Sequence, residues 1–444
     1  MSNLIHTNDY AGFYEAKMQH YVPNNVTELK SIILNNKGKE ICIVGSKYSH
    51  GGHTLLNNAI YINMVNLNKL KIDLSKKYVE AESGSTWRHV LEYVDKYNLS
   101  VAEMQSYSNF SVGGSISVNC HGRGMEYGTI ADTIIYMDVM LCNGEIRRTY
   151  PNDDLFRSVV GGYGGVAIII SAALRLVNND LLFKERIIYD NTRDNFYKML
   201  NYSTKSVFFN CNIYPYHRDR LVSYVYHKVK DININVDVVK LKRLQDVNTY
   251  YPIHMIAEQA IRRIPLFKYV RGVIEPNVEV KEENIFWRNY ELSHDVNKHK
   301  TLVKYPTTTV LQEYMIPVDN AFTFLLSLLN VLDKYDVNYL NISMRYIKAT
   351  RIPILNYSPV DTISFVLYYN VLNNEYGYKC TKEWTNILIC KTIDLNGYFY
   401  LPYLRLLTKN QFNIMYNKDL YKKIKNKYDP YHMFSSQFLQ FYVD

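Results

Sequence analysis

The stretch SVGGSISVNCHGRGMEYG, residues 111–128, concentrates glycine and small side chains in a chain with only 19 glycines among its 444 residues. Gly113 and Gly114 can adopt backbone angles that residues with a Cβ avoid, and their amides can approach a phosphate closely. For this pair alone, a tight structural turn is the simpler explanation. The chain contains two further glycine-rich stretches, VGSKYSHGGH at 44–53 and VGGYGG at 160–165, and together the three favour a binding role over a structural turn.

Three such stretches in one N-terminal region predict a long nucleotide cofactor that lies across several turns. A Rossmann site for NAD is the natural rival, but its glycine fingerprint stands between a strand and a helix. Here the third stretch runs into AIIISAALRL, residues 167–176, which is typical of a buried strand. The pattern therefore disfavours NAD.

The length and composition of the chain predict a folded protein of at least two domains. A single hydrophobic core stops growing at roughly 250–300 residues, whereas this chain has 444, with 47% hydrophobic and 21% charged residues. Six scattered cysteines without a CxxC pair indicate a reducing compartment. The N-terminus has no continuous apolar segment, and the apolar window 159–177 contains four glycines and Arg175. We therefore expect an intracellular, cytoplasmic protein without a transmembrane span.

The net charge of +9 includes basic clusters at 240–243, 262–271 and 422–427. We interpret them as solvated surface with some attraction for anionic ligands. No recognised nucleic-acid-binding module accompanies them, so nucleic acid is not an expected partner.

Residues 1–178 alternate helix and strand signals. Asn25 and Glu28 resemble a capping pair before a helical apolar pattern, residues 40–44 and 78–81 predict strands, and 86–97 predicts a helix. The Asn143-Gly144 dipeptide predicts a hairpin. We assign residues 1–178 to a first domain of two α+β subdomains.

The composition changes near residues 178–180, where strand-like runs become longer and richer in aromatic residues. Alternation predicts strands at 206–213, 308–316, 338–347 and 364–370, with a helix at 321–333. This pattern is typical of an antiparallel sheet with helices on one side. We expect a second domain at 179–415 and a C-terminal segment, 416–444, formed by a short basic helix, a stop at Pro430 and an aromatic tail.

The order VGSxxSxGGH, SVGGSISVNxHGRGxxYG and DLFRxVVGGYG, followed by an apolar strand ending in LRL, resembles the PCMH-type FAD-binding domain of the vanillyl-alcohol oxidase superfamily. The aldonolactone and sugar-alcohol oxidase branch looks most similar. LQEYMIP (311–317), LNISMRY (340–346), YFYLPY (398–403) and KYDPYHMFSSQF (427–438) continue the resemblance. It implies an α+β, two-domain fold with an antiparallel-sheet substrate (cap) domain, and a C-terminal segment that returns to the FAD domain.

The resemblance also implies FAD as the cofactor, with the first loop around the pyrophosphate and the second along the flavin. Many relatives attach FAD covalently through a histidine at the position of Tyr48, so we expect non-covalent FAD here. Ala167 stands where a glycine is usual. The implied cofactor-binding residues are Gly45, Ser46, Lys47, Tyr48, Ser49, Gly51, Gly52, Gly113, Gly114, Ser117, His121, Gly122, Ile168 and Ile169.

A flavin that oxidises an alcohol needs a group that handles the hydroxyl proton and a positive charge near the ring. Arg345 is the candidate for that charge, and Glu313 for holding Arg345 or the substrate from a neighbouring strand. Relatives carry a glutamate where Ser343 stands, and Tyr403 falls where they place active-site groups. We expect oxidation of a hydroxyl-bearing sugar, polyol or lactone-like molecule, with oxygen or another electron acceptor.

Other interpretations of these motifs are weaker. His50 and His53 could suggest a metal pair, but further ligands at suitable spacing are absent. Cys120 is more simply a small packing residue than a reactive thiol. The alternative function is a flavin-fold binding or structural protein that has lost catalysis, which Tyr48 and Ser343 motivate.

Overall fold

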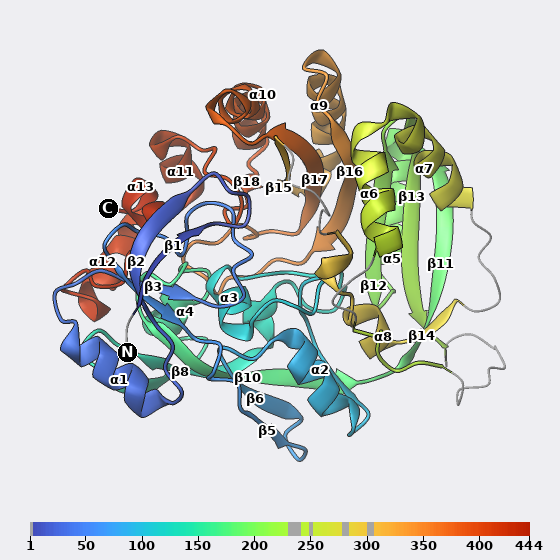
Figure 1. Cartoon of the computed structure of the whole chain (residues 1–444). Helices are drawn as coiled ribbons and strands as arrows, with labels where there is room; N and C mark the ends of the chain where they lie inside the picture. The colour runs from blue at the N-terminus through green and yellow to red at the C-terminus, as the bar shows by residue number, and fades with distance from the viewer. Residues whose placement is uncertain (1–2, 230–240, 248–251, 278–283, 300–305) are drawn as a thin grey trace.

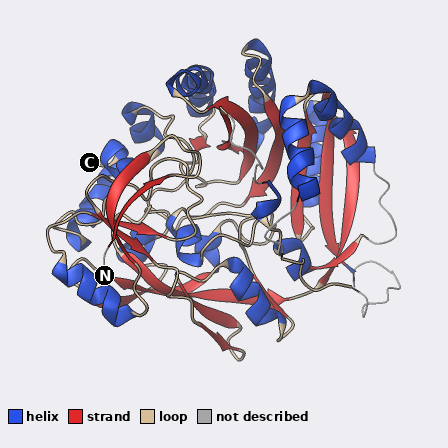
Figure 2. Cartoon of the chain, in the orientation of Figure 1, coloured by secondary structure: helices blue, strands red, loops and turns tan. Residues whose placement is uncertain are grey.

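The computed structural model describes residues 3–229, 241–247, 252–277, 284–299 and 306–444, so Lys240 of the first basic cluster lies outside the described residues. The described chain forms three β-sheets, with most helices on their outer sides (Figures 1 and 2). The fold class is α+β, as predicted.

The N-terminal region contains two of the sheets. The first has the order β1-β2-β4-β3, with β1 antiparallel to β2 and the other pairs parallel. Its strands are β1 (Asn3–Asn8), β2 (Glu15–Tyr21), β3 (Ile41–Val44) and β4 (Ile60–Asn63). Helix α1 (Val26–Asn35) begins as predicted, because the Asn25 side chain accepts a hydrogen bond from the Glu28 amide.

The second sheet is antiparallel and has the order β5-β6-β10-β8-β9, with β7 paired to β10. Helix α2 (Trp87–Asp95) packs against it, and helix α4 (Asp154–Val159) precedes β10. The β8–β9 hairpin turns at Asn143-Gly144, as predicted. The strands are β5 (Leu70–Asp73), β6 (Tyr78–Glu82), β7 (Leu99–Val101), β8 (Ile134–Met140), β9 (Ile146–Thr149) and β10 (Ile168–Asn178).

The glycine-rich stretch at 111–124 is not a loop throughout, which corrects the sequence interpretation. Residues Val112–Ser117 form the short helix α3, and the Ser115 amide donates to the Ser111 carbonyl. The small side chains allow this helix to lie directly on the end of β6. A Cβ on Gly113 would lie 2.6 Å from the Cβ of Ser83. Glycine is therefore required there by close packing.

The third sheet is antiparallel throughout and has the order β14-β11-β13-β12-β16-β17-β15-β18. The predicted strands at 206–213, 308–316, 338–347 and 364–370 and the helix at 321–333 are confirmed within a few residues. The strands are β11 (Leu181–Asp190), β12 (Phe208–Tyr214), β13 (His217–Lys228), β14 (Ile285–Trp287), β15 (Thr307–Pro317), β16 (Tyr339–Ile347), β17 (Thr362–Leu372) and β18 (Tyr398–Phe399).

Helices cover one face of this sheet. Helix α5 (Arg193–Ser203) contacts β11, α9 (Ala321–Lys334) contacts β15, and α10 (Glu375–Asp394) contacts β15 and β17. Three further helices, α6 (Pro252–Arg263), α7 (Pro265–Asn277) and α8 (Arg288–Leu292), belong to the insertion between β13 and β15. The sheet face opposite α10 is left for the site described below.

The C-terminal helices pack back on the N-terminal region. They are α11 (Lys409–Met415), α12 (Lys418–Tyr428) and α13 (Gln437–Tyr442), drawn in orange to red in Figure 1. The Lys425 Nζ donates to the Gly165 carbonyl at 2.7 Å, and the Gln437 amide donates to the Leu55 carbonyl at 2.7 Å. Two segments separated by several hundred residues thus share one core.

Candidate active site

A cavity of about 860 Å³ lies between the N-terminal sheets and the face of the eight-stranded sheet opposite α10. Its lining combines residues of all three glycine-rich stretches with residues of β12, β15, β16 and β17. The volume falls in the range of cofactor and ligand sites, roughly 300–1,000 Å³. The sequence motifs of both halves of the chain therefore meet in one place.

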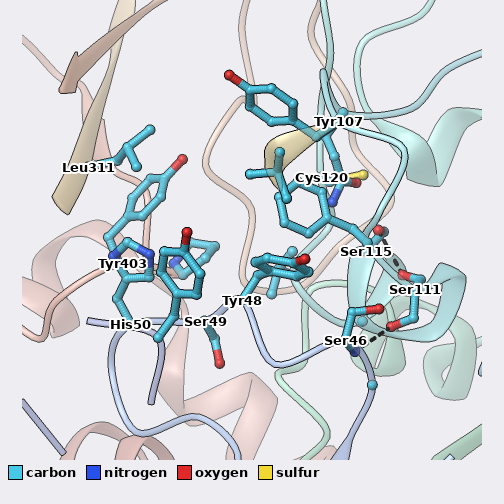
Figure 3. Close-up of a pocket in the computed structure, with 18 of the residues that line it drawn as sticks. Ser46, Tyr48, Ser49, His50, Tyr107, Ser111, Ser115, Cys120, Leu311 and Tyr403 are labelled. Carbon is cyan, nitrogen blue, oxygen red and sulfur yellow. Dashed lines mark hydrogen bonds between the residues drawn. The ribbon is translucent and has the colours of Figure 1, made fainter. Parts of the chain in front are cut away.

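The first two glycine-rich stretches touch directly at one end of this cavity. The Ser46 amide donates to the Ser111 Oγ at 3.3 Å, as Figure 3 shows. A Cβ on Gly45 would lie 2.0 Å from the same oxygen, so only glycine allows this approach. The backbone of Gly45 and Ser46 is consequently brought beside the start of α3.

Most of the predicted cofactor-binding residues line the cavity. They are Gly45, Ser46, Lys47, Tyr48, Ser49, Gly113, Gly114, Ser117, His121, Ile168 and Ile169. Gly51, Gly52 and Gly122 are not among the residues that line it, so a direct role for them stays a prediction. A Cβ on Gly51 would lie 2.5 Å from the Tyr403 carbonyl oxygen. A Cβ on Gly52 would lie 2.9 Å from the Gln437 Oε1, and one on Gly122 would lie 2.1 Å from the Met104 carbonyl oxygen. These three glycines are fixed by packing.

The open side of the loops fits a flat, phosphate-bearing group such as FAD. Gly114 and Gly164 both line the cavity, and a Cβ on Gly164 would meet no atom within 4 Å. A Cβ on Gly114 would meet only the Ser111 Oγ, at 3.0 Å. At these positions the missing side chain leaves space toward the cavity. The amides of such glycines can approach a ligand closely.

Tyr48 lies between the Ser46–Ser111 end and the His50–Tyr403 end in Figure 3. Its ring contacts Phe110 edge to face, with centroids 4.6 Å apart, and lies 5.4 Å from the ring of Tyr10. Burial, assisted by Tyr10 and Asp295, raises the pKa of Tyr48 to about 12. The side chain is therefore a neutral phenol at neutral pH.

The two histidines of the first loop are held as neutral rings. His50 stacks on Tyr10 with centroids 5.2 Å apart, and burial lowers its pKa to about 4. His53 Nδ1 accepts from the Gly51 amide at 3.2 Å, and its Nε2 lies 3.0 Å from the Leu401 carbonyl. Burial lowers the pKa of His53 to about 3. Within the described part of the chain no cluster of side chains could hold a metal ion.

The wall opposite the loops is the face of the eight-stranded sheet. One row across it contains Asn212 of β12, Ser343 of β16, Val366 of β17 and Glu313 of β15. Glu313 and Arg345 were expected on neighbouring strands, but β17 lies between β15 and β16. Both side chains still face the cavity because their strands present alternate residues to one face.

Glu313 is bound by three hydrogen-bond donors. Its Oε1 lies 2.6 Å from His121 Nε2 and accepts from the Ser364 Oγ, and its Oε2 accepts from the Tyr403 hydroxyl at 3.3 Å. Burial alone would raise the pKa of Glu313, but His121, Arg345 and Ser364 together outweigh it and lower that pKa. The Glu313 carboxylate is therefore ionised. It is hydrogen-bonded to His121 and Tyr403, and the positive charge of Arg345 lies nearby.

Arg345 lines the cavity from β16. Its Nε is buried and has no hydrogen-bond partner among the described residues. An unpaired buried donor of this kind is unfavourable unless a ligand or water satisfies it. All four predicted catalytic residues, Arg345, Glu313, Ser343 and Tyr403, are thus placed around one cavity.

A buried carboxyl group lies behind the second glycine-rich stretch. Cβ atoms on Gly122 and Gly124 would lie 2.2 Å and 2.0 Å from the carboxylate of Glu103. Burial raises the pKa of Glu103 to about 7, although Arg288, Arg345 and Arg123 lower it. Cys120 is buried nearby, and burial raises the pKa of its thiol, so it fits the predicted packing role.

Several lining residues were not found from the sequence. Tyr10, Tyr107 and Phe110 come from loops without a local motif. The cap side contributes carboxamides and a phenol on alternate strand positions, which the two-residue period of β12, β16 and β17 could have revealed. These residues are Asn210, Asn212, Asn341 and Tyr368.

Comparison with known proteins agrees with this geometry. Residues 20–150 match the family model described as "FAD binding domain". The D-arabinono-1,4-lactone oxidase of Yarrowia lipolytica is 28% identical over 177 residues, which are 37% of this chain and 33% of that protein. The L-gulonolactone oxidase of Mus musculus is 25% identical over 36% of this chain and 37% of that protein. The chain thus spans about a third of the length of the curated relatives that it matches.

Solved structures resemble the whole chain in fold. A cholesterol oxidase from Brevibacterium sterolicum has a TM-score of 0.74 at 13% identity, over 100% of this chain and 97% of that one. A solvent-stable cholesterol oxidase has a TM-score of 0.75 at 15% identity, over 99% and 98%. The predicted α+β, two-domain fold is confirmed. Residues 20–150 are accordingly an FAD-binding domain, FAD is the cofactor, and the chain is related to the aldonolactone oxidases.

Proposed function

We propose that this protein oxidises a hydroxyl group of a sugar, polyol or lactone-like molecule. When bound, FAD would accept the hydride from the carbon that carries that hydroxyl, and oxygen or another acceptor would reoxidise it. One observation carries the proposal. The cavity that joins the three glycine-rich stretches also contains Arg345 and the His121–Glu313–Tyr403 network.

Arg345 supplies a fixed positive charge in this proposal. Its Nε is buried without a partner in the described structure, so a developing negative charge or a substrate oxygen would satisfy it. Tyr403 would take the hydroxyl proton and pass its own toward Glu313 Oε2, to which it already donates. Burial, assisted by Glu313, raises the pKa of Tyr403 well above its usual value, so the phenol keeps its proton until that transfer.

The sheet wall supports a hydroxylated substrate. Asn212 and Ser343 lie opposite each other on β12 and β16, and Asn341 lies two residues before Ser343 on the same face. Carboxamide and hydroxyl groups can donate to and accept from substrate hydroxyls. No carboxylate stands at Ser343, so substrate contact at this position would be through a neutral hydroxyl.

We also propose non-covalent FAD, a division into 1–178, 179–415 and 416–444, and an intracellular setting. The neutral phenol of Tyr48 supports non-covalent attachment of FAD. The change of sheet between β10 and β11 supports the boundary near 178. All six cysteines are unpaired, which supports a reducing compartment.

The test begins with the absorbance spectrum of the purified protein, followed by acid precipitation. We expect a flavin spectrum and release of the flavin into the supernatant. Anaerobic mixing with sugars, polyols and aldonolactones should then bleach the flavin with at least one compound. Flavin retained in the pellet would contradict non-covalent attachment. Bound flavin that no compound reduces, while ligands still shift its spectrum, would favour the non-catalytic binding protein.

Replacement of Arg345 is the sharpest variant. Arg345→Ala should bind FAD normally but lose about 10²- to 10³-fold in turnover, as for other preorganised charge-stabilising groups. Arg351→Ala is the matched control, because Arg351 is exposed and does not line the cavity. Unchanged turnover in Arg345→Ala would remove this residue from the reaction centre.

A further inference from the structure

The eight-stranded sheet lines the cavity well beyond the reaction centre. On β15, Thr307, Thr309, Leu311 and Glu313 stand at alternate positions, and all four line the cavity. At roughly 3.3 Å per residue, this lining runs for about 20 Å along the strand. The reaction centre at Glu313 therefore lies at one end of a long wall.

The burial of side chains changes in one direction along this wall. Glu313 is 1% exposed, Leu311 is half-buried and Thr307 is exposed. Glu313 thus lies at the closed end of the wall and Thr307 at its mouth. Figure 3 shows Leu311 on the opposite side of the pocket from Ser46 and Ser111, where two glycine-rich stretches meet. The mouth half is therefore distinct from the part of the cavity that would hold the phosphates of FAD.

One row of side chains crosses the sheet next to the reaction centre, on the side of the mouth. Asn341 of β16 and Leu311 of β15 both pair with Tyr368 of β17. All three residues line the cavity, and we call them the outer row. They stand two residues nearer the mouth than the row that contains Glu313. The Asn341 carboxamide makes no hydrogen bond with another described residue, so its donors and acceptor are available to a ligand.

Helix α6 fixes the position of Tyr368. The Tyr368 hydroxyl accepts from the Arg262 Nη2 at 2.7 Å, and the Arg262 carbonyl accepts from the Asn370 side chain at 2.9 Å. The Glu258 Oε2 lies 3.5 Å from the Arg262 Nε, so the charge of this arginine is compensated. The outer row therefore offers a fixed phenol ring without an uncompensated charge beside it.

A second tyrosine borders the mouth from the N-terminal side of the cavity. Tyr10 lies in the turn between β1 and β2, where its amide donates to the Ser49 carbonyl at 3.1 Å and its ring stacks on His50. Burial raises the pKa of Tyr10, and the charge of Arg262 opposes that rise. The Tyr10 phenol is therefore within electrostatic reach of the helix that holds Tyr368. Tyrosine rings from both walls thus line this half of the cavity.

This combination of side chains suits a neutral sugar ring. A sugar ring has apolar C–H faces that pack on an aromatic ring, and hydroxyls at its edge that bond to carboxamides and hydroxyls. The outer row and Thr309 provide both kinds of group. A phosphate or carboxylate would instead need an uncompensated cation, and Arg262 is already paired with Glu258.

We propose that the outer row and Tyr10 form a second sugar-binding subsite, so that the natural substrate is a saccharide of at least two rings. The ring that is oxidised lies beside Arg345 and Tyr403, and the next ring rests on Tyr368. This inference rests on the proposed oxidation of a hydroxyl group, to which it adds the length of the substrate.

The test compares one sugar ring with two in the FAD-loaded protein. Glucose, cellobiose, maltose and lactose all present a reducing glucose unit, and xylose with xylobiose is a second pair. Anaerobic reduction of the flavin measures reaction, and the shift of the flavin spectrum measures the dissociation constant independently. At least one disaccharide should bind about tenfold more tightly than its monosaccharide, as one added aromatic contact allows.

Replacement of the two tyrosines tests the subsite itself. Tyr368→Leu should remove the disaccharide advantage and leave the constants for glucose unchanged, whereas Tyr368→Phe keeps the ring and should keep the advantage. Tyr10→Leu should also reduce the advantage, and this variant decides the matter if Tyr368→Leu does not fold. Tyr189→Leu is the matched control, because Tyr189 is a half-buried tyrosine of β11 in the same sheet and does not line the cavity.

Four results would overturn the subsite: binding of no sugar, equal constants for one ring and two, a disaccharide advantage that survives both leucine variants, or octyl glucoside bound as tightly as the best disaccharide. The last result would assign the outer row to an apolar chain. Reduction of the flavin by glucose alongside any of these results would leave the proposed oxidation standing. Tight disaccharide binding without reduction by any compound would instead contradict the oxidation and retain the subsite.

Discussion

The smallest unit that bears on function is the hydrogen-bond network around Glu313. Its carboxylate is held by His121, Ser364 and Tyr403, and only Tyr403 combines a contact to Glu313 with a hydroxyl that the substrate would reach. Removing that hydroxyl tests the proposed proton path. Tyr403→Phe should lower turnover by about 10²-fold, the lower range for a proton-transfer group, while FAD binding is retained.

Tyr400→Phe is the comparison for this prediction. Tyr400 also lines the cavity, but its hydroxyl donates to the Val118 carbonyl at 3.1 Å and is not bound to Glu313. Its loss should change turnover only slightly. Steady-state rates with one reducing substrate would decide, and similar rates for both variants would contradict a role specific to Tyr403.

The sequence alone predicted the part of this site that lies on a single strand. Ser343 and Arg345 stand two residues apart on one strand, so alternation alone puts them on one face. The pairing of His121 with Glu313 joins positions 192 residues apart. No local pattern in the sequence indicates such a contact, because it arises only when the loop after α3 packs against β15.

At the scale of elements, helix α12 fixes the third glycine-rich stretch. The Tyr421 hydroxyl donates to the Gly162 carbonyl at 2.6 Å, and Lys425 donates to the Gly165 carbonyl. Tyr163 and Gly164, between these anchors, line the cavity. The basic helix predicted from the C-terminal sequence therefore supports the cofactor site, a role that its charge pattern did not indicate.

Tyr421→Phe should accordingly weaken FAD binding. One net hydrogen bond contributes roughly 0.5–1.5 kcal/mol, so we expect the dissociation constant of FAD to rise about two- to tenfold. Equilibrium dialysis of the flavin would measure it. Tyr442→Phe removes an equally buried hydroxyl that donates to the Leu407 carbonyl, away from the loop. That variant should lose stability but bind FAD unchanged, and an equal effect of both would refute the anchoring role.

At the scale of the whole molecule, His53 lies where three parts of the chain meet. Its ring stacks on Phe438 of the C-terminal segment with centroids 4.4 Å apart and lies 5.4 Å from the ring of Tyr163. Its Nε2 contacts the Leu401 carbonyl. A neutral His53 therefore links the first glycine-rich stretch, the third one and the segment after the cap sheet.

The lowered pKa of His53 makes this junction sensitive to acid. Burial moves that pKa from the usual value of 6.5 to about 3, so the unfolded chain binds the proton more readily than the folded one. The stabilisation is present above about pH 6.5 and is lost progressively as the pH falls toward 3. The free energy of unfolding can fall by about 1.4 kcal/mol for each pH unit in this range. We expect unfolding and release of FAD to shift to lower temperature in this range.

His53→Gln isolates this contribution, because glutamine can donate to the Leu401 carbonyl but does not titrate. The variant should be less stable than the unchanged protein at about pH 7.5, and the difference should shrink at about pH 5. Replacement of the exposed His89 by glutamine is the control and should change the stability of the protein little, because that side chain is not packed in the interior. A gap between His53→Gln and the unchanged protein that stays constant with pH would mean that His53 is not neutralised by folding. The junction would then be held by stacking and packing alone, and acid release of FAD would have to start elsewhere.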